Sequence, residues 1–213
     1  MQSFCPCLFS LVPKQNRYPT EKMQIAHRID RETSGVLLIA KKRSALVGLH
    51  EQLREGAFDK RYLVLVRGRW RDEKRRVRLS LHKFATQEGE RRVRVEEEGQ
   101  AAETIFYRRR TWLDHDPPLA LLEAELKTGR THQIRVHLTH LGFPLAGDDK
   151  YGDFAWNKVL AKQGLKRMFL HSFSLGFVHP LTGQPMAFES PLPDDLSRFV
   201  ARLEAAAADA KDA

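Results

Sequence analysis

The stretch VRLSLHKFATQEGERRVRVEEEGQAAETIFY, residues 77–107, holds three short runs of β-forming residues separated by Gly89 and Gly99. These runs predict strands at Val77–Phe84, Arg91–Val95 and Ala101–Tyr107. Glycines at this spacing are typical of tight connections between neighbouring strands. The stretch therefore predicts antiparallel hairpins.

More strands are expected on both sides of this stretch. The predicted strands are Gly35–Ala40 (GVLLIA), Lys60–Arg67 (KRYLVLVR), Leu119–Leu126, and the alternating residues 169–177 with a partner around Met186–Glu189. In Lys60–Arg67 the side chains of Tyr62, Val64 and Val66 fall on one face, because successive strand residues alternate. Tyr62 is therefore expected to share a face with valines.

Helical patterns are fewer. A first helix is expected from a Ser44 cap to Gly56, a second from a Thr131 cap to Gly142, and a third from about Asp194, with an Ala-rich tail that frays. The segment between Gly142 and Gly152 is expected to be an ordered loop. The combined pattern predicts an α+β fold, with a mixed, mostly antiparallel sheet flanked by helices in a single domain.

Composition limits the possible functions. The chain has 213 residues and a net charge of +9, from 36 Lys+Arg against 27 Asp+Glu. No apolar run approaches the roughly 20 residues of a membrane-spanning helix. A positive surplus attracts polyanions, and nucleic acid is the commonest one. The alternative is a solvated face with nearby counter-charges, because Asp72 and Glu73 interrupt the basic run of residues 67–78.

Cys5 and Cys7 are too close for an ordinary disulfide, which favours a reducing cytoplasm.

The segment HRIDRETSG, residues 27–35, concentrates ionisable groups just before a predicted strand. Arg28 and Arg31 flank Asp30, and neighbouring positive charges favour an ionised carboxylate that can act as a nucleophile or a base. The alternative role for Asp30 is a helix cap or a salt bridge.

A metal site is another possibility, because the sequence holds three histidines close together, His132, His137 and His140. No HExxH pattern or nearby carboxylate supports it.

Three long segments resemble a known family. HRIDRETSG at 27–35, DKRYLVLVRG at 59–68 and KTGRTHQIRVHLTHLGFPLAGDDKYG at 127–152 are similar to motifs of RluA-type pseudouridine synthases, in particular the RluC-like enzymes of large-subunit ribosomal RNA. FLHSFSLGFVHPLTG at 169–183 resembles the closing hairpin of the same enzymes. The resemblance extends from about residue 24 to 204. It implies a lead-in over 1–26, a pseudouridine synthase catalytic domain over 27–204 and a frayed tail over 205–213.

The resemblance assigns roles to individual residues. It implies that Asp30 is the catalytic nucleophile, that Arg135 pairs with this carboxylate, and that Tyr62 stacks on the target uracil. Arg28 would take the place of the flipped base. The remaining substrate contacts implied are Thr33, Arg130, His132 and Leu170. Lys41, Lys42, Lys127, Arg130 and the basic residues of 67–78 would hold phosphates.

The implied activity is isomerisation of uridines in large-subunit ribosomal RNA by a cytoplasmic monomer that needs neither metal nor cofactor. The Lys-Pro strand and the separate RNA-binding domain of many relatives are not recognisable in residues 1–26, so this lead-in is expected to be divergent or truncated. The alternative function is a catalytically inactive RNA-binding or ribosome-assembly module derived from such an enzyme. A metal-dependent nuclease that uses the three histidines is a third possibility.

Overall fold

A computed structural model describes residues 8–10 and 23–212 of the chain. The sequence interpretations of Cys5, Cys7 and most of the lead-in lie outside these residues. No described helix is long and apolar enough to cross a membrane.

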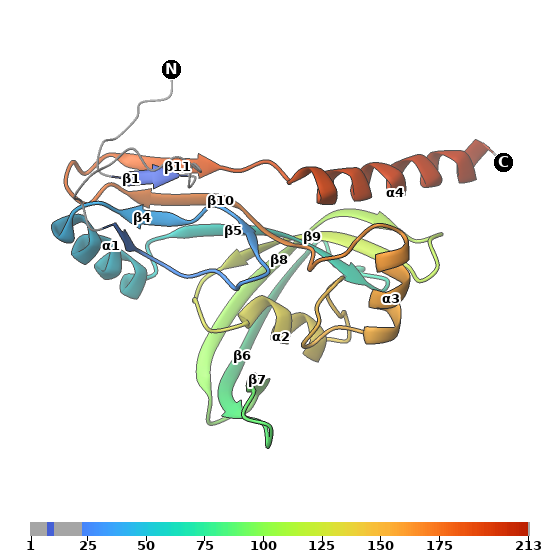
Figure 1. The fold of residues 1–213 in the computed structure, drawn as a ribbon, viewed down its shortest axis with the longest axis horizontal. Helices are drawn as coiled ribbons and strands as arrows, with labels where there is room; N and C mark the ends of the chain where they lie inside the picture. Colours follow the sequence, from blue (N-terminus) through green and yellow to red (C-terminus); the bar gives the residue numbers. More distant parts are fainter. Residues whose placement is uncertain (1–7, 11–22, 213) are drawn as a thin grey trace.

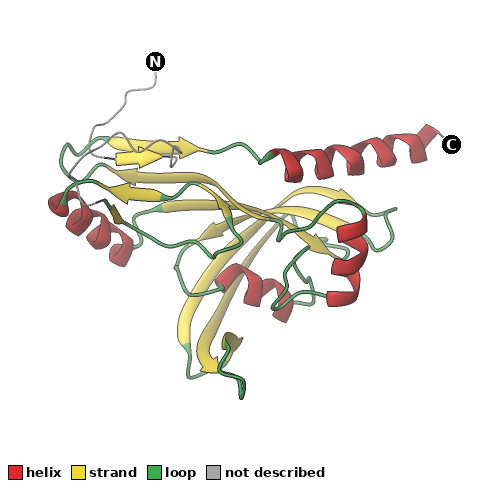
Figure 2. Ribbon diagram, in the orientation of Figure 1, coloured by secondary structure: helices red, strands yellow, loops and turns green. Residues whose placement is uncertain are grey.

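An eight-stranded sheet forms the centre of the described structure (Figures 1 and 2). Its path is β11-β10-β5-β9-β8-β6-β7, and β3 pairs with β10 in parallel, whereas the neighbouring pairs along the path are antiparallel. Its strands are β3 (Ser34–Gly35), β5 (Asp59–Arg67), β6 (Lys74–Ala85), β7 (Arg91–Val95), β8 (Gln100–Trp112), β9 (Leu119–Leu126), β10 (Leu170–Val178) and β11 (Pro185–Glu189). The predicted fold class, a mixed and mostly antiparallel sheet with flanking helices, is confirmed.

A smaller sheet contains β1 (Leu8–Ser10), β4 (Leu38–Ala40) and β2 (Gln24–Ile25) in the order β1-β4-β2. Two short pieces of the lead-in therefore pair with the chain that follows. The predicted continuous strand Gly35–Ala40 is divided between the two sheets, with Gly35 in β3 and Leu38–Ala40 in β4. Parts of the lead-in are therefore strands, although no strand was predicted there.

The stretch 77–107 forms its three predicted strands, but only one of the two connections is a hairpin. β6 pairs with both β7 and β8, so β8 lies on the opposite side of β6 from β7. The chain between β7 and β8 must therefore cross to the other edge of β6. Gly99 makes this crossing possible, because a Cβ there would lie 2.5 Å from the backbone carbonyl carbon of Leu81.

Helices cover both faces of the sheet (Figure 1). They are α1 (Arg43–Glu55), α2 (Gln133–His140), α3 (Phe154–Lys162) and α4 (Asp194–Asp212). α2 lies inside the curve formed by β6, β7 and β8, where Ile134 and Leu138 pack against Tyr62, Val64 and Val66. α3 and the start of α4 pack on the opposite face with Leu65 and Leu119. Tyr62 thus shares its face with the two valines, as predicted.

Some helix boundaries differ from the sequence expectations. α1 ends at Gly56 as predicted, but its N-cap is Lys42 and not Ser44. α3 was not predicted at all. Its N-cap is Asp153, whose side chain accepts from the Trp156 N–H. α4 continues as a helix to Asp212, past the boundary expected near residue 205.

Candidate active site

A cavity of about 620 Å³ lies between the loop before β3, the strand β5 and the start of α2. This volume is within the range of roughly 300–1,000 Å³ that is typical of small-ligand pockets. The structure brings all eight residues predicted for the site to the wall of this one cavity: Arg28, Asp30, Thr33, Tyr62, Arg130, His132, Arg135 and Leu170. Their chemical roles stay predictions.

The loop that carries Asp30 is fixed by backbone contacts to β10. A turn forms where the Thr33 N–H donates to the Asp30 carbonyl oxygen at 2.9 Å. Gly35 then follows with φ of +109° and approaches β10 so closely that a Cβ would lie 2.0 Å from the carbonyl oxygen of Ser172. Only glycine fits this approach and this φ. The Val36 N–H donates to the same oxygen at 2.8 Å, so the loop and the strand cannot separate without losing this contact.

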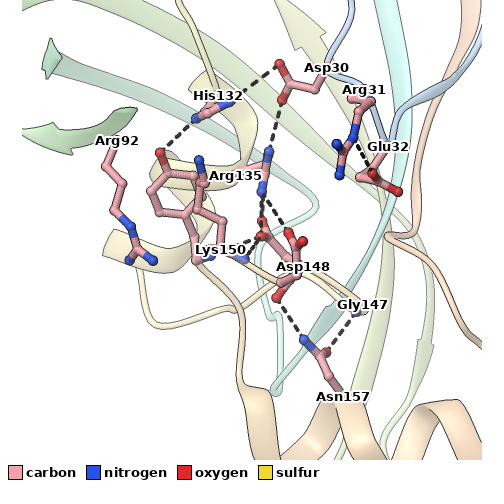
Figure 3. Close-up of polar contacts among 12 residues, drawn as sticks. Asp30, Arg31, Glu32, Arg92, His132, Arg135, Gly147, Asp148, Lys150 and Asn157 are labelled. Carbon is pink, nitrogen blue, oxygen red and sulfur yellow. Dashed lines mark hydrogen bonds and ion pairs between the residues drawn. The ribbon is translucent and has the colours of Figure 1, made fainter. Parts of the chain in front are cut away.

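The Asp30 carboxylate faces Arg135 (Figure 3). Arg135 Nη1 lies 3.4 Å from Asp30 Oδ2, and the two side chains are 5% and 16% exposed. With an effective dielectric constant of about 20, a unit pair at this separation attracts by about 5 kcal/mol before the desolvation cost is subtracted. The predicted pairing of these two residues, which are far apart in sequence, is thus present in the geometry.

Arg135 is held in place by a second carboxylate that sequence reasoning missed. Asp148 is fully buried and accepts from Arg135 Nε and Nη2 at 2.7 Å each, a two-point contact. Its Oδ1 also accepts from the N–H groups of Lys150 and Tyr151 at 2.9 Å. The segment expected to be only an ordered loop therefore orients the guanidinium that faces Asp30.

Charge pairing outweighs burial at this contact. Burial acts to raise the pKa of Asp148, but the hydrogen bonds and charge of Arg135 hold that pKa below its usual value. In the same way burial acts to lower the pKa of Arg135, while Asp148 and Asp30 raise it. The pair therefore stays ionised, and the Arg135 guanidinium remains a fixed positive charge beside Asp30.

Tyr62 and Leu170 form an apolar part of the cavity wall. Tyr62 is 6% exposed and Leu170 is 4% exposed, and the two belong to one core cluster. Burial raises the pKa of the Tyr62 hydroxyl to about 12, and the nearby charge of Asp30 acts in the same direction. The phenol is therefore uncharged at neutral pH, and its ring can offer a face to a planar ligand.

The polar residues at the cavity differ in exposure. Arg28 and Arg130 are exposed, and Arg130 Nε donates to the Ala101 carbonyl oxygen at 3.1 Å. Thr33 is buried, and its hydroxyl has no hydrogen-bond partner among the described residues. The two arginines are thus placed to meet a large ligand at the cavity opening.

His132 connects Asp30 to a tyrosine that was also missed. Its φ of +53° is in the left-handed region, and it occupies the N-cap position of α2 that was predicted for Thr131. Its Nδ1 lies 2.8 Å from Tyr151 Oη, and its Nε2 lies 3.9 Å from Asp30 Oδ1. The Tyr151 hydroxyl oxygen in turn accepts from the Val93 N–H at 2.9 Å. Burial lowers the pKa of His132, which favours a neutral ring.

The three histidines considered for a metal site have different environments. His137 is fully buried and neither ring nitrogen has a hydrogen-bond partner among the described residues, whereas His140 is exposed. Within residues 8–10 and 23–212, no group of three His, Cys, Asp or Glu side chains is arranged to hold a metal ion.

The basic run of residues 67–78 carries many counter-charges. Its members within 4 Å of a carboxylate are Arg67 with Asp153, Arg75 with Asp72, and Arg76 and Arg78 with Glu103. These arginine side chains remain between 38% and 66% exposed. The alternative of a solvated face with nearby counter-charges thus describes part of this run. Because these arginine side chains are exposed, they can still exchange a carboxylate partner for a phosphate.

The chain is similar to known proteins of one family. Residues 10–140 match the family described as RNA pseudouridylate synthase. The chain is 47% identical to Ribosomal large subunit pseudouridine synthase C of Haemophilus ducreyi over 86% of this chain and 56% of that protein. It is also 47% identical to the protein of the same name in Escherichia coli K12, over 85% of this chain and 56% of that protein. The chain therefore spans about half the length of these curated relatives.

A solved structure shows the same fold. Human RNA Pseudouridylate Synthase Domain Containing 1 superposes with a TM-score of 0.68 and 25% identity, over 86% of this chain and 80% of that one. Domain Containing 4, also human, gives a TM-score of 0.66 at 22% identity. With the family match over more than half of its length, the chain belongs to the RNA pseudouridylate synthase family.

Proposed function

We propose that this chain converts uridines of large-subunit ribosomal RNA to pseudouridine. Family membership and the names of its relatives support the reaction and the substrate. The observation that carries the proposal is the Asp30 carboxylate, which faces Arg135 at 3.4 Å on the wall of the cavity that also contains Tyr62.

The reaction rearranges a nucleotide without adding or removing an atom overall. The bond between ribose C1′ and uracil N1 breaks, and a bond between C1′ and C5 forms. The C5 proton is lost and N1 gains one. Asp30 is the nucleophile, with the uracil ring and the ribose C1′ as its two possible points of attack. Arg135 keeps the carboxylate ionised and oriented, and the proposed reaction uses neither metal nor cofactor.

Access to Asp30 requires the target uridine to leave its stack, at a cost of a few kcal/mol. Stacking on an aromatic ring is worth about 1–3 kcal/mol per base, so Tyr62 can offset much of this cost. Arg28 is exposed beside Asp30 and can occupy the space that the base leaves. Leu170, Thr33 and His132 would contact the base and ribose within the cavity.

Positive charge supports binding of the rest of the RNA. The net charge of +9 attracts the phosphate backbone, and Arg130 and Lys127 are exposed at the cavity. We propose that the protein acts on RNA in the cytoplasm and as a monomer.

The test is pseudouridine formation in large-subunit RNA transcribed in vitro. Wild type, Asp30→Asn and Glu32→Gln are incubated with the RNA, and modified positions are located by carbodiimide treatment and primer extension. Glu32 is the matched control, because it lies in the same loop and, among the residues that the structure describes, its side chain pairs only with the exposed Arg31. We expect pseudouridine with wild type and Glu32→Gln and none with Asp30→Asn.

Two results would contradict the proposal. Wild type that binds the RNA without modifying it would favour the inactive RNA-binding module. Shortened RNA, with a loss of shortening on addition of chelator, would favour a nuclease.

A further inference from the structure

Lys60 is a buried cation on the cavity wall that the proposed reaction leaves without a role. It is 8% exposed and lies on β5 two residues before Tyr62, so both side chains project from the same face of the strand. Its neighbours Asp59 and Arg61 project from the opposite face and pair with each other at 2.8 Å. Lys60 therefore lines the cavity and takes no part in the ion pair between Asp59 and Arg61.

No described residue neutralises this lysine. Its Nζ forms no hydrogen bond or ion pair with residues 8–10 or 23–212, and it lies against Gly129, where an added Cβ would be 3.4 Å away. The titratable group that it influences is His27, whose pKa is lowered by burial and also by the Lys60 charge. Burial lowers the pKa of Lys60 itself. A buried, unpaired ammonium group is costly, so it is seldom kept where an apolar side chain would fit equally well.

Since no described residue supplies the counter-charge of Lys60, we look for it in a ligand of the cavity. Uracil and ribose are uncharged at neutral pH, whereas every phosphodiester of RNA carries one negative charge. The Asp30 carboxylate is already paired with Arg135, and Glu55 at the cavity edge is exposed to water. Of the parts of a nucleotide, only the phosphate offers Lys60 a full charge.

We propose that Lys60 forms an anion subsite inside the cavity, and that its ligand is a phosphodiester adjoining the extruded uridine. This inference rests on the proposed function for the identity of the RNA. It gives Lys60 a binding role separate from that of the exposed arginines, because the Lys60 side chain is buried on the cavity wall between β5 and the turn before α2.

Binding measurements at several salt concentrations test this subsite without requiring turnover. Dissociation constants of wild type, Lys60→Met, Lys60→Arg and Lys158→Met are measured by fluorescence anisotropy with a labelled fragment of large-subunit RNA that contains the target uridine. Lys158 is the matched control, since it is exposed on α3 and does not line the cavity.

We expect Lys60→Met to bind at least about tenfold more weakly and to lower the slope of log K against log salt by about 0.7–0.9, the effect of one lost phosphate contact. Lys60→Arg should retain the slope, and Lys158→Met should change little. The melting temperature of Lys60→Met should equal or exceed that of wild type, because an apolar side chain suits the buried position better. An unchanged slope, or weaker binding explained by a lower melting temperature, would overturn the inference.

RNA with one uncharged linkage in place of a phosphodiester shows which phosphate Lys60 contacts. A methylphosphonate is placed on the 5′ or 3′ side of the modified uridine, or five nucleotides away. The difference between wild type and Lys60→Met should disappear for one of the two adjoining linkages and persist for the distant one. A difference that persists for all three would overturn the assignment to the target nucleotide. If wild type forms no pseudouridine, the proposed function fails, while the salt slopes still decide whether Lys60 binds phosphate.

Discussion

Replacing Asp148 with asparagine tests how Arg135 is held. The change keeps the size of the side chain, but it removes the charge and turns one acceptor oxygen into an NH₂ group that faces the guanidinium. Each charge-assisted hydrogen bond of Arg135 is worth about 1.5–3 kcal/mol, and two are made to Asp148 at 2.7 Å. Removing one partner of a buried ion pair costs about 3–5 kcal/mol. Because Asp30 remains as a partner at 3.4 Å, we expect a loss of about 3 kcal/mol.

Urea unfolding followed by circular dichroism at pH 7 measures this loss. Asp149→Asn is the control, because Asp149 is 75% exposed and lies 3.7 Å from the same guanidinium. An exposed charge at this distance contributes little, so the control should stay within about 0.5 kcal/mol of wild type. Pseudouridine formation by Asp148→Asn should fall steeply, because Arg135 no longer has a fixed orientation toward Asp30.

A double variant separates the ion pair from the surrounding loop. Arg135→Met combined with Asp148→Asn removes the unpaired guanidinium and keeps the oxygen that accepts from the Lys150 and Tyr151 N–H groups. This variant should regain most of the lost stability but stay inactive. Equal stability of Asp148→Asn and Asp149→Asn would refute the electrostatic reasoning. A double variant no more stable than Asp148→Asn would show that the loss arose in the loop.

Three further predictions concern other parts of the structure. Gly35→Ala should lower the unfolding free energy by more than about 2 kcal/mol, since its Cβ would meet the Ser172 carbonyl, and unchanged urea unfolding would contradict this. Burial lowers the pKa of His137 from 6.5 to about 4, so as the pH falls the imidazole is protonated in the unfolded chain before it is protonated in the folded protein. The unfolding free energy of wild type should therefore fall by about 3 kcal/mol relative to that of His137→Leu between pH 7 and pH 4. Equal pH dependence of the two proteins would refute that. Tyr151 Oη lies 2.8 Å from His132 Nδ1, and a hydroxyl that donates there favours the Nε2–H tautomer of the ring. Tyr151→Phe should therefore let His132 populate both tautomers, as ¹H–¹⁵N spectra of the ring would show.

Strands were predicted well because their signals are local. Leu119–Leu126 coincides with β9, and its buried residues face both sides of the sheet. The order of β7, β6 and β8 could not be predicted in this way, since β8 pairs with residues of β6 that lie between 19 (Leu81↔Gln100) and 33 (Lys74↔Tyr107) positions earlier in the sequence. The helix α3 did have a local signal, because Asp153 is a good N-cap and Trp156 and Leu160 have helical spacing.

The candidate site was predicted only where a resemblance supplied the roles. Asp30, Tyr62 and Arg135 lie together as expected, but charge and spacing alone left Asp30 open to a role as a cap or salt bridge. Asp148 was missed because an acidic residue in a glycine-rich loop usually remains in solvent. Only the fold shows that this loop returns beneath α2 and buries the carboxylate against Arg135.

The parallel pairing of β3 with β10 has a consequence for the timing of synthesis. The loop that carries Asp30 is fixed against Ser172, and β10 itself pairs with β5, so these parts need a strand that is translated more than 130 residues after the loop. A nascent chain that has exposed HRIDRETSG, β5 and even α2 still lacks the backbone against which Gly35 rests. Competence for the proposed reaction therefore arises late in translation, after residues 170–178 have emerged from the exit tunnel of the ribosome.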